Sequence, residues 1–110
     1  MSELIYNKRI DELEVYSSRG EYKASVRDDD YIFHVSHDGK VIGVEILNAS
    51  ENLQLDPKVL SNIKEAKIKS HIQTGGKHNL LEVGILLLGK DTNYQRDLRI
   101  RNLHNNPIKA

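Results

Sequence analysis

Two histidines and a glutamate near a tight turn are the residues best suited to chemistry. His34 and His37 precede the pair Asp38-Gly39, and Glu45 follows in the next apolar run. Imidazole and carboxylate groups transfer protons and bind metals, so these residues could form a hydrolase or metal site if they met across a hairpin. No H-E-x-x-H motif occurs, and strand positions three apart face opposite sides. We therefore favour exposed polar positions.

Other motifs with catalytic or metal-binding potential are weaker. Asp28, Asp29 and Asp30 are adjacent, whereas a calcium loop needs spaced carboxylates and a glycine, so we interpret them as a turn between strands. The chain has no cysteine, which removes disulfides, thiolate metal sites and cysteine nucleophiles. It has no nucleophile elbow and no phosphate-binding Gly-rich loop. We expect no enzymatic activity, no cofactor and no metal.

The composition indicates one small folded domain. The chain has 110 residues, of which 38% are hydrophobic and 29% charged, with only two prolines. The most apolar stretch, residues 80–88, is too short for a membrane helix, and the N-terminal residues lack the apolar core of a signal peptide. We expect a cytoplasmic protein that makes no membrane contact.

Charge is unevenly distributed although the net charge is zero. Residues 1–55 contain six Lys and Arg against eleven Asp and Glu, a balance of −5. Residues 56–110 contain ten against five, a balance of +5. Either one half of the fold faces the other, or the basic half meets an acidic partner.

Alternation of apolar and polar residues predicts a mainly β fold, α+β at most. We expect an antiparallel sheet of about six or seven strands connected as hairpins. Asp38-Gly39 indicates a type I′ turn, in which both central residues have positive φ. In the following strand we expect Ile42, Val44 and Ile46 to share one buried face. Gly43, in mid-strand, indicates a bulge or a close approach by another backbone.

The second half begins with a helix and continues with strands. Asp56-Pro57 predicts the start of one short helix near residues 57–63. Gly75-Gly76 predicts a turn before residues 80–88, which we expect to form a central strand. The single domain, 1–110, then divides as follows: a β-hairpin region (1–50), a loop with the short helix (51–64), a second β region (65–103) and a tail (104–110).

Several short motifs in the first half form a recognisable pattern, listed here in chain order: Tyr6-Asn7, Leu13-Glu14-Val15-Tyr16, Asp38-Gly39 and the run from Val41 to Ser50. Over residues 6–50 this pattern resembles an uncharacterised prokaryotic family, the domain of unknown function 2283. The chain departs from the family before the Asp-Gly turn, where His34, Ser36 and His37 replace the usual carboxylates. Some members appear beside toxin-like genes, so the resemblance implies a partner-binding or antitoxin-like role.

Basic and apolar residues of the last strands predict a contact surface. If Val83, Ile85 and Leu87 face the core, Leu86 and Leu88 lie on the polar face of the sheet. A small sheet with apolar residues on both faces usually covers the second face, by folding over itself or by pairing with another chain. We predict a protein-interaction or self-association module, a homo-oligomer or a complex with a protein partner, that uses Leu86, Leu88, Arg99 and Arg101.

The alternative is nucleic-acid binding through the cations of the same region, namely Lys67, Lys69, Arg99 and Arg101. Such cations contact phosphates, and single-stranded nucleic acids also need aromatic platforms for their bases. Tyr94 is the only aromatic residue after residue 55. We therefore favour a protein partner.

Overall fold

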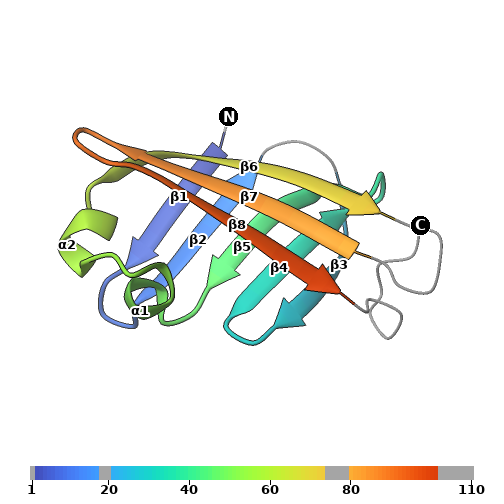
Figure 1. Cartoon of the computed structure of the whole chain (residues 1–110), viewed down its shortest axis with the longest axis horizontal. Helices are drawn as coiled ribbons and strands as arrows, with labels where there is room; N and C mark the ends of the chain where they lie inside the picture. Colours follow the sequence, from blue (N-terminus) through green and yellow to red (C-terminus); the bar gives the residue numbers. More distant parts are fainter. Residues whose placement is uncertain (1, 18–20, 74–79, 102–110) are drawn as a thin grey trace.

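The computed structural model describes residues 2–17, 21–73 and 80–101, which form two antiparallel sheets stacked face to face (Figure 1). The five-stranded sheet has the order β1-β2-β5-β4-β3. Its strands are β1 (Ser2–Asn7), β2 (Glu12–Ser17), β3 (Tyr22–Asp28), β4 (Tyr31–Ser36) and β5 (Val41–Ile46). The three-stranded sheet has the order β6-β7-β8. Its strands are β6 (Ile63–Gln73), β7 (Leu80–Gly89) and β8 (Asn93–Arg101).

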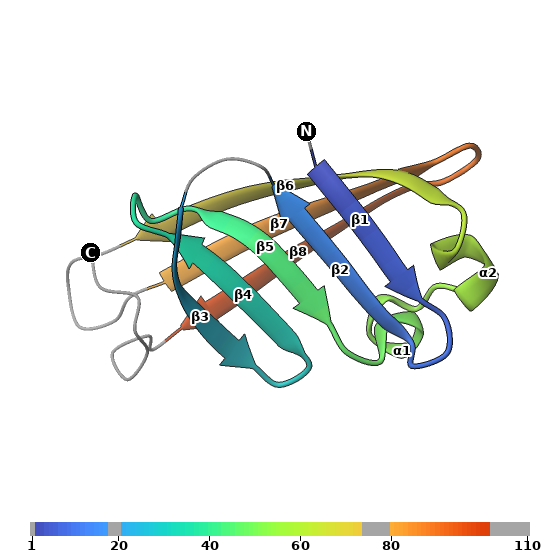
Figure 2. The same ribbon diagram turned by 180° about the vertical axis from the view of Figure 1, so that it is seen from behind.

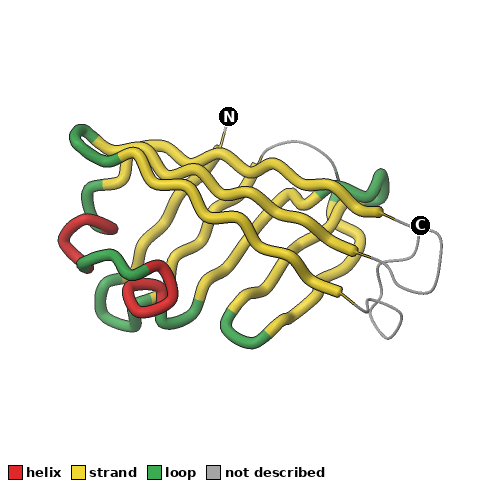
Figure 3. Tube along the Cα trace, viewed as in Figure 1, coloured by secondary structure: helices red, strands yellow, loops and turns green. Residues whose placement is uncertain are grey.

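The predicted mainly β, antiparallel fold is confirmed, with eight strands in the described ranges rather than six or seven. Figure 3 shows the three long strands crossing the five shorter ones, and Figure 2 shows the five-stranded sheet from its outer side. Two short helices, α1 (Ala49–Leu53) and α2 (Pro57–Leu60), lie at one end, where the chain passes from one sheet to the other. The acidic and basic halves of the sequence therefore correspond to the two sheets.

The core lies between the sheets and consists of alternate residues from both. The buried side chains of the five-stranded sheet include Leu13, Phe33 and Val44. From β7 the buried side chains are Leu81, Val83, Ile85 and Leu87, in strict alternation with half-buried neighbours. β7 is the central strand of its sheet, as predicted, and each of its inward side chains stabilises the fold by about 1.5–3 kcal/mol when fully buried.

The prediction for β5 is wrong at Ile42. His34 pairs with Gly43 but Val35 pairs with Val41, so Ile42 is an extra residue in the ladder. This bulge turns Val41 toward the core together with Val44 and Ile46, and leaves Ile42 half-buried. Gly43 therefore marks a bulge, as predicted.

The hairpin between β4 and β5 is confirmed, but its turn type is not. The N–H of Gly39 donates to the Ser36 carbonyl at 3.0 Å, so His37 and Asp38 are the central residues. Gly39 has φ +81°, whereas Asp38 does not have positive φ. A type I turn followed by a left-handed glycine satisfies these observations. The Ser36 hydroxyl donates to the Asp38 carboxylate, and this hydrogen bond lowers the pKa of Asp38.

The described residues form two helices where one was predicted. Asp56 caps α2 as expected, because its side chain accepts from the Lys58 N–H at 2.8 Å. The helix ends at Leu60, and Ile63 already opens β6 rather than ending the helix. α1 contains the predicted boundary between residues 50 and 51. The predicted Gly75-Gly76 turn and the tail, 104–110, lie outside the described residues.

Asp11 fixes α1 to the end of the five-stranded sheet. Its carboxylate accepts from the Ser50 hydroxyl at 2.6 Å and from the Tyr6 hydroxyl at 2.6 Å. Its backbone carbonyl accepts from the Ala49 N–H at 2.9 Å. Burial alone would raise the pKa of Asp11, but the hydrogen bonds from Ser50 and Tyr6 outweigh it and the pKa is lowered. A contact across 39 positions thus decides where this helix begins.

Two mid-strand glycines allow a matched test of how tightly the Tyr16 and His34 rings pack over position 43. A Cβ on Gly43 would lie 2.8 Å from the Tyr16 ring and 3.1 Å from the His34 ring. A Cβ on Gly84 would lie 3.2 Å from a carboxylate oxygen of exposed Asp97, which can move aside. We expect Gly43→Ala to lower the free energy of unfolding by about 1–3 kcal/mol. Gly84→Ala should leave it unchanged or raise it by up to about 1 kcal/mol.

Urea denaturation followed by circular dichroism measures both changes. Equal unfolding free energies for the two variants would show that Tyr16 and His34 do not constrain position 43.

Candidate functional site

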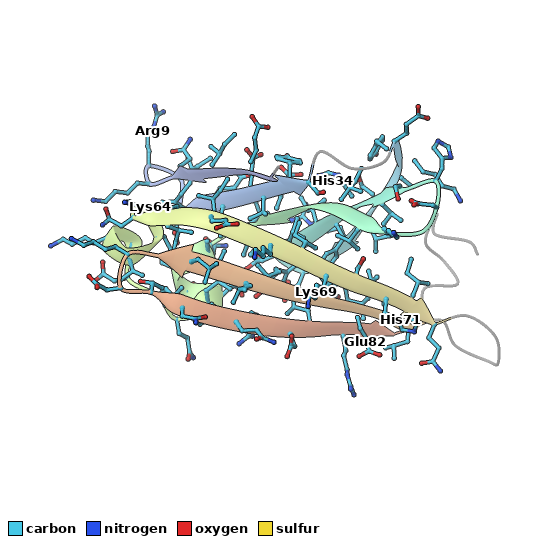
Figure 4. The ribbon with its side chains drawn as sticks, turned by 90° about the horizontal axis from the view of Figure 1, so that it is seen from above. Arg9, His34, Lys64, Lys69, His71 and Glu82 are labelled. Carbon is cyan, nitrogen blue, oxygen red and sulfur yellow. The ribbon has the colours of Figure 1, made fainter. Side chains whose placement is uncertain are left out.

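The outer surface of the three-stranded sheet carries the residues predicted to bind a partner. We call this surface the β6–β8 outer face. The strand registers place three residues side by side in each row: His71, Glu82 and Arg99; then Lys69, Gly84 and Asp97; then Lys67, Leu86 and Gln95. Figure 4 shows Lys69, His71 and Glu82 together on this sheet. Leu86 thus has Lys67 beside it on β6 and Gln95, not a predicted cation, beside it on β8.

A hollow of about 540 Å³ opens on this face over Gly84, the position without a side chain. Leu86 contributes its apolar side chain, and Lys69 and Asp97 flank Gly84 on the neighbouring strands. Leu88 is also half-buried, next in line on β7. Arg101 ends β8, and its side chain lies outside the described residues.

Charges of both signs alternate around the hollow. The Arg99 Nε lies 3.6 Å from a Glu82 carboxylate oxygen, with 66% of the Arg99 side chain exposed. Gln95 donates to Asp97 at 3.3 Å. Tyr94 packs against the core on the inner face, so no aromatic side chain of the described residues stands among the cations. The face is mixed in charge rather than uniformly basic.

A polar chain crosses the outer surface of the five-stranded sheet. The Glu45 carboxylate lies 2.7 Å from His34 Nε2, and Ser25 Oγ lies 2.8 Å from His34 Nδ1. Tyr22 extends the chain, with its hydroxyl 2.9 Å from Ser25 Oγ. Tyr16 stacks on His34 with ring centroids 5.9 Å apart. The two rings meet above Gly43, which pairs with both residues.

The structure therefore joins two of the four residues of the predicted hydrolase or metal site. His34 and Glu45 meet and are only 18% and 19% exposed, so the expectation of exposed positions is wrong for this pair. His37 is exposed and belongs to the turn, where its N–H donates to the Glu21 carbonyl. Asp38 is bound to Ser36 in the same turn.

Hydrogen bonds connect Ser25, His34 and Glu45 in the order in which a nucleophile, its base and the acid that orients the base are connected in catalytic sites. Sequence reasoning missed Ser25 because it comes from another hairpin strand, directly opposite His34 in the β3–β4 register. Acyl transfer also needs N–H groups that converge on an oxyanion. Successive N–H groups of a strand point in opposite directions, so the backbone around Ser25 does not gather them. We infer that these contacts hold four strands together across their outer surface.

Three glutamates approach one another beside this chain. Oxygens of Glu12, Glu14 and Glu45 all lie within 4.8 Å, and all three residues are half-buried. Burial, a hydrogen bond with Glu45 and the charges of Glu45 and Glu12 raise the pKa of Glu14. These oxygens could hold a divalent cation, which prefers such ligands. They can also relieve their repulsion by sharing a proton, so their proximity alone does not indicate a cation.

The match to a known family covers only the five-stranded sheet. Residues 4–50 match the family described as "Protein of unknown function (DUF2283)", which confirms the resemblance found in the sequence. This range contains most of β1 and all of β2 to β5. The motif residues hold this sheet together: Gly43 lies under two rings, Glu45 binds His34, and Ser50 binds Asp11. The β6–β8 outer face lies beyond the matched range.

Comparisons with curated proteins and with solved structures gave no match. Neither helix of the described ranges has the length and apolar character required to cross a membrane.

The raised pKa of Glu14 predicts that replacing this residue changes the free energy of unfolding in a pH-dependent way. Because the folded state favours protonated Glu14, its contribution to stability is full below the unfolded pKa and is lost as pH rises through the folded pKa. Glu14→Gln should therefore raise the unfolding free energy at pH 7 by about 0.5–1 kcal/mol, by removing like charge opposite Glu45. The gain should disappear near pH 3.

Thermal unfolding across this pH range gives the comparison. Glu3→Gln, on the exposed edge of the same sheet surface, is the control. A Glu14→Gln variant less stable than the unsubstituted protein at pH 7 would contradict the assigned repulsion.

Proposed function

We propose that this chain is a protein-interaction module whose contact surface is the β6–β8 outer face. The observation that carries the proposal is the hollow over Gly84, with Leu86 in it and Lys69 and Asp97 on either side. Protein contacts combine an apolar centre with a polar, charged rim. A hollow also accepts a protruding side chain of a partner, and such buried anchors contribute most of the binding energy.

The charge arrangement supports a protein as the partner. Lys69 and Asp97 face each other across Gly84, and Glu82 pairs with Arg99 one row further along. A surface with alternating positive and negative charges fixes the orientation of a partner whose charges are complementary. It attracts a uniformly charged partner less strongly. The antitoxin-like role and the cytoplasmic location stay predictions, since they rest on the resemblance and on composition.

Nucleic-acid binding is the second candidate, because Lys67, Lys69 and Arg99 share one face. Two observations make it weaker: Glu82 and Asp97 lie among these cations, and Tyr94 faces the core. Phosphate contacts make affinity fall steeply with salt. Fluorescence anisotropy with DNA and RNA oligonucleotides should show no such salt-dependent binding, and a steep dependence would favour this candidate instead.

Photo-crosslinking at the hollow tests the proposal. A photoreactive amino acid replacing Leu86 should give covalent protein adducts in cells, because the side chain would lie in the contact. The matched control replaces Ile5, which is 49% exposed on the outer surface of the other sheet. Mass spectrometry identifies the adducts. Adduct levels at position 86 no higher than at position 5 would overturn the proposal.

A further inference from the structure

Among the strands of the described ranges, β8 forms a long and regular open edge of the three-stranded sheet. It has nine residues, pairs with β7 without a register shift, and is the lower margin of the front sheet in Figure 1. The edge strands β3 and β6 both contain irregularities in their pairing, and β1 contacts β6 of the opposite sheet. A regular open edge is a template for another strand.

The free side of β8 can be assigned to particular residues. The Gly89 N–H donates to the Thr92 carbonyl at 2.9 Å, so the Thr92 backbone points toward β7. Because backbone groups alternate along a strand, Asn93, Gln95, Asp97 and Arg99 direct theirs toward the open edge. A second strand that pairs there in antiparallel orientation must bond to these residues.

The side chains at these positions are self-complementary in one register. When two copies of β8 are centred on Leu98, Asp97 of each copy lies opposite Arg99 of the other, on the same sheet face. Twofold symmetry repeats this pair and places the two Leu98 side chains together. Centring on Asp97, Arg99 or Arg96 instead places that charged residue opposite itself, which is unfavourable.

The charged groups needed for this pairing are accessible. Asp97 and Arg99 are exposed, and the bond of Arg99 to Glu82 is a long one on the surface. An inward-facing charge on an edge strand can block pairing, and Arg96 faces inward. However, its Nε is buried and its charge acts on Tyr31 of the other sheet, where it opposes the rise in the Tyr31 pKa that burial causes. Arg96 therefore belongs to the space between the sheets.

We propose that β8 binds β8 of a second copy, antiparallel and centred on Leu98, so that two three-stranded sheets become one of six strands. This pairing uses the edge and the side chains of Asp97 and Arg99 beside the hollow, and leaves Gly84, Leu86 and Lys69 uncovered. The two proposals share Asp97 and Arg99, but photo-crosslinking at Leu86 on the outer face and disulfide formation at Leu98 on the edge strand test them separately.

Cysteine crosslinking tests the register, because the chain has no cysteine of its own. Opposed residues on the axis would have Cα atoms about 4.5 Å apart, within disulfide range. Leu98→Cys should form a disulfide-linked dimer under mild oxidation. Gln95→Cys is the control, since its two copies would lie about 20 Å apart along the strands. A Leu98→Cys variant that stays uncrosslinked, or a Gln95→Cys variant that crosslinks equally, would overturn the proposal.

Charge reversal gives a second test that does not depend on crosslinking. Asp97→Arg and Arg99→Asp each place like charges opposite each other, and each should raise the dimer dissociation constant at least tenfold in analytical ultracentrifugation. An equimolar mixture of the two variants should recover association, because every opposed pair then has opposite signs. The register would be overturned if the unsubstituted chain stays monomeric. It would also be overturned if neither reversal changes the dissociation constant, or if the mixture of the two variants does not associate.

Discussion

Each sheet has one apolar face, and the two apolar faces are buried because they pack against each other. Phe33 and Leu13 from one sheet and Ile85 and Leu87 from the other are fully buried in that layer. Everything else on the strands must then point outward. β6, β7 and β8 have 11, 10 and 9 residues, against six or seven in the other strands. The long sheet therefore presents both an extended outer face and a long edge.

The two outer surfaces differ because the sequence places its charges by halves. The five-stranded sheet carries the glutamate cluster and the His34–Glu45 pair, whose contacts are satisfied within the sheet. The three-stranded sheet carries exposed Lys67, Lys69 and Arg99, and within the described ranges the ion pair on this sheet is that of Arg99 with Glu82. A side chain that already makes hydrogen bonds or ion pairs within its own sheet has fewer of them available for a partner. This contrast favours the three-stranded sheet as the surface for other proteins.

The sequence predicted what depends on alternation and failed where distant contacts decide. Leu81, Val83 and Ile85 alternate with Glu82 and Gly84, so the core face of β7 was predictable although Leu86 and Leu88 are apolar as well. Ile42 follows the same alternation, but a bulge set by pairing with β4 moves it to the outer side. β1 was missed because Leu4, Ile5 and Tyr6 are consecutive apolar residues without alternation. The start of α1 depends on Asp11, and no local pattern reveals a contact to Ser50.

Amide hydrogen exchange at increasing protein concentration tests most directly whether the β8 edge of the three-stranded sheet pairs with a second copy. The N–H groups of Gln95, Asp97 and Arg99 should exchange more slowly as concentration rises, because pairing would remove them from water. The amides of β3, an edge strand of the other sheet, should not change. Exchange at these β8 positions that stays the same at every concentration, or slowing confined to β3, would contradict the assignment.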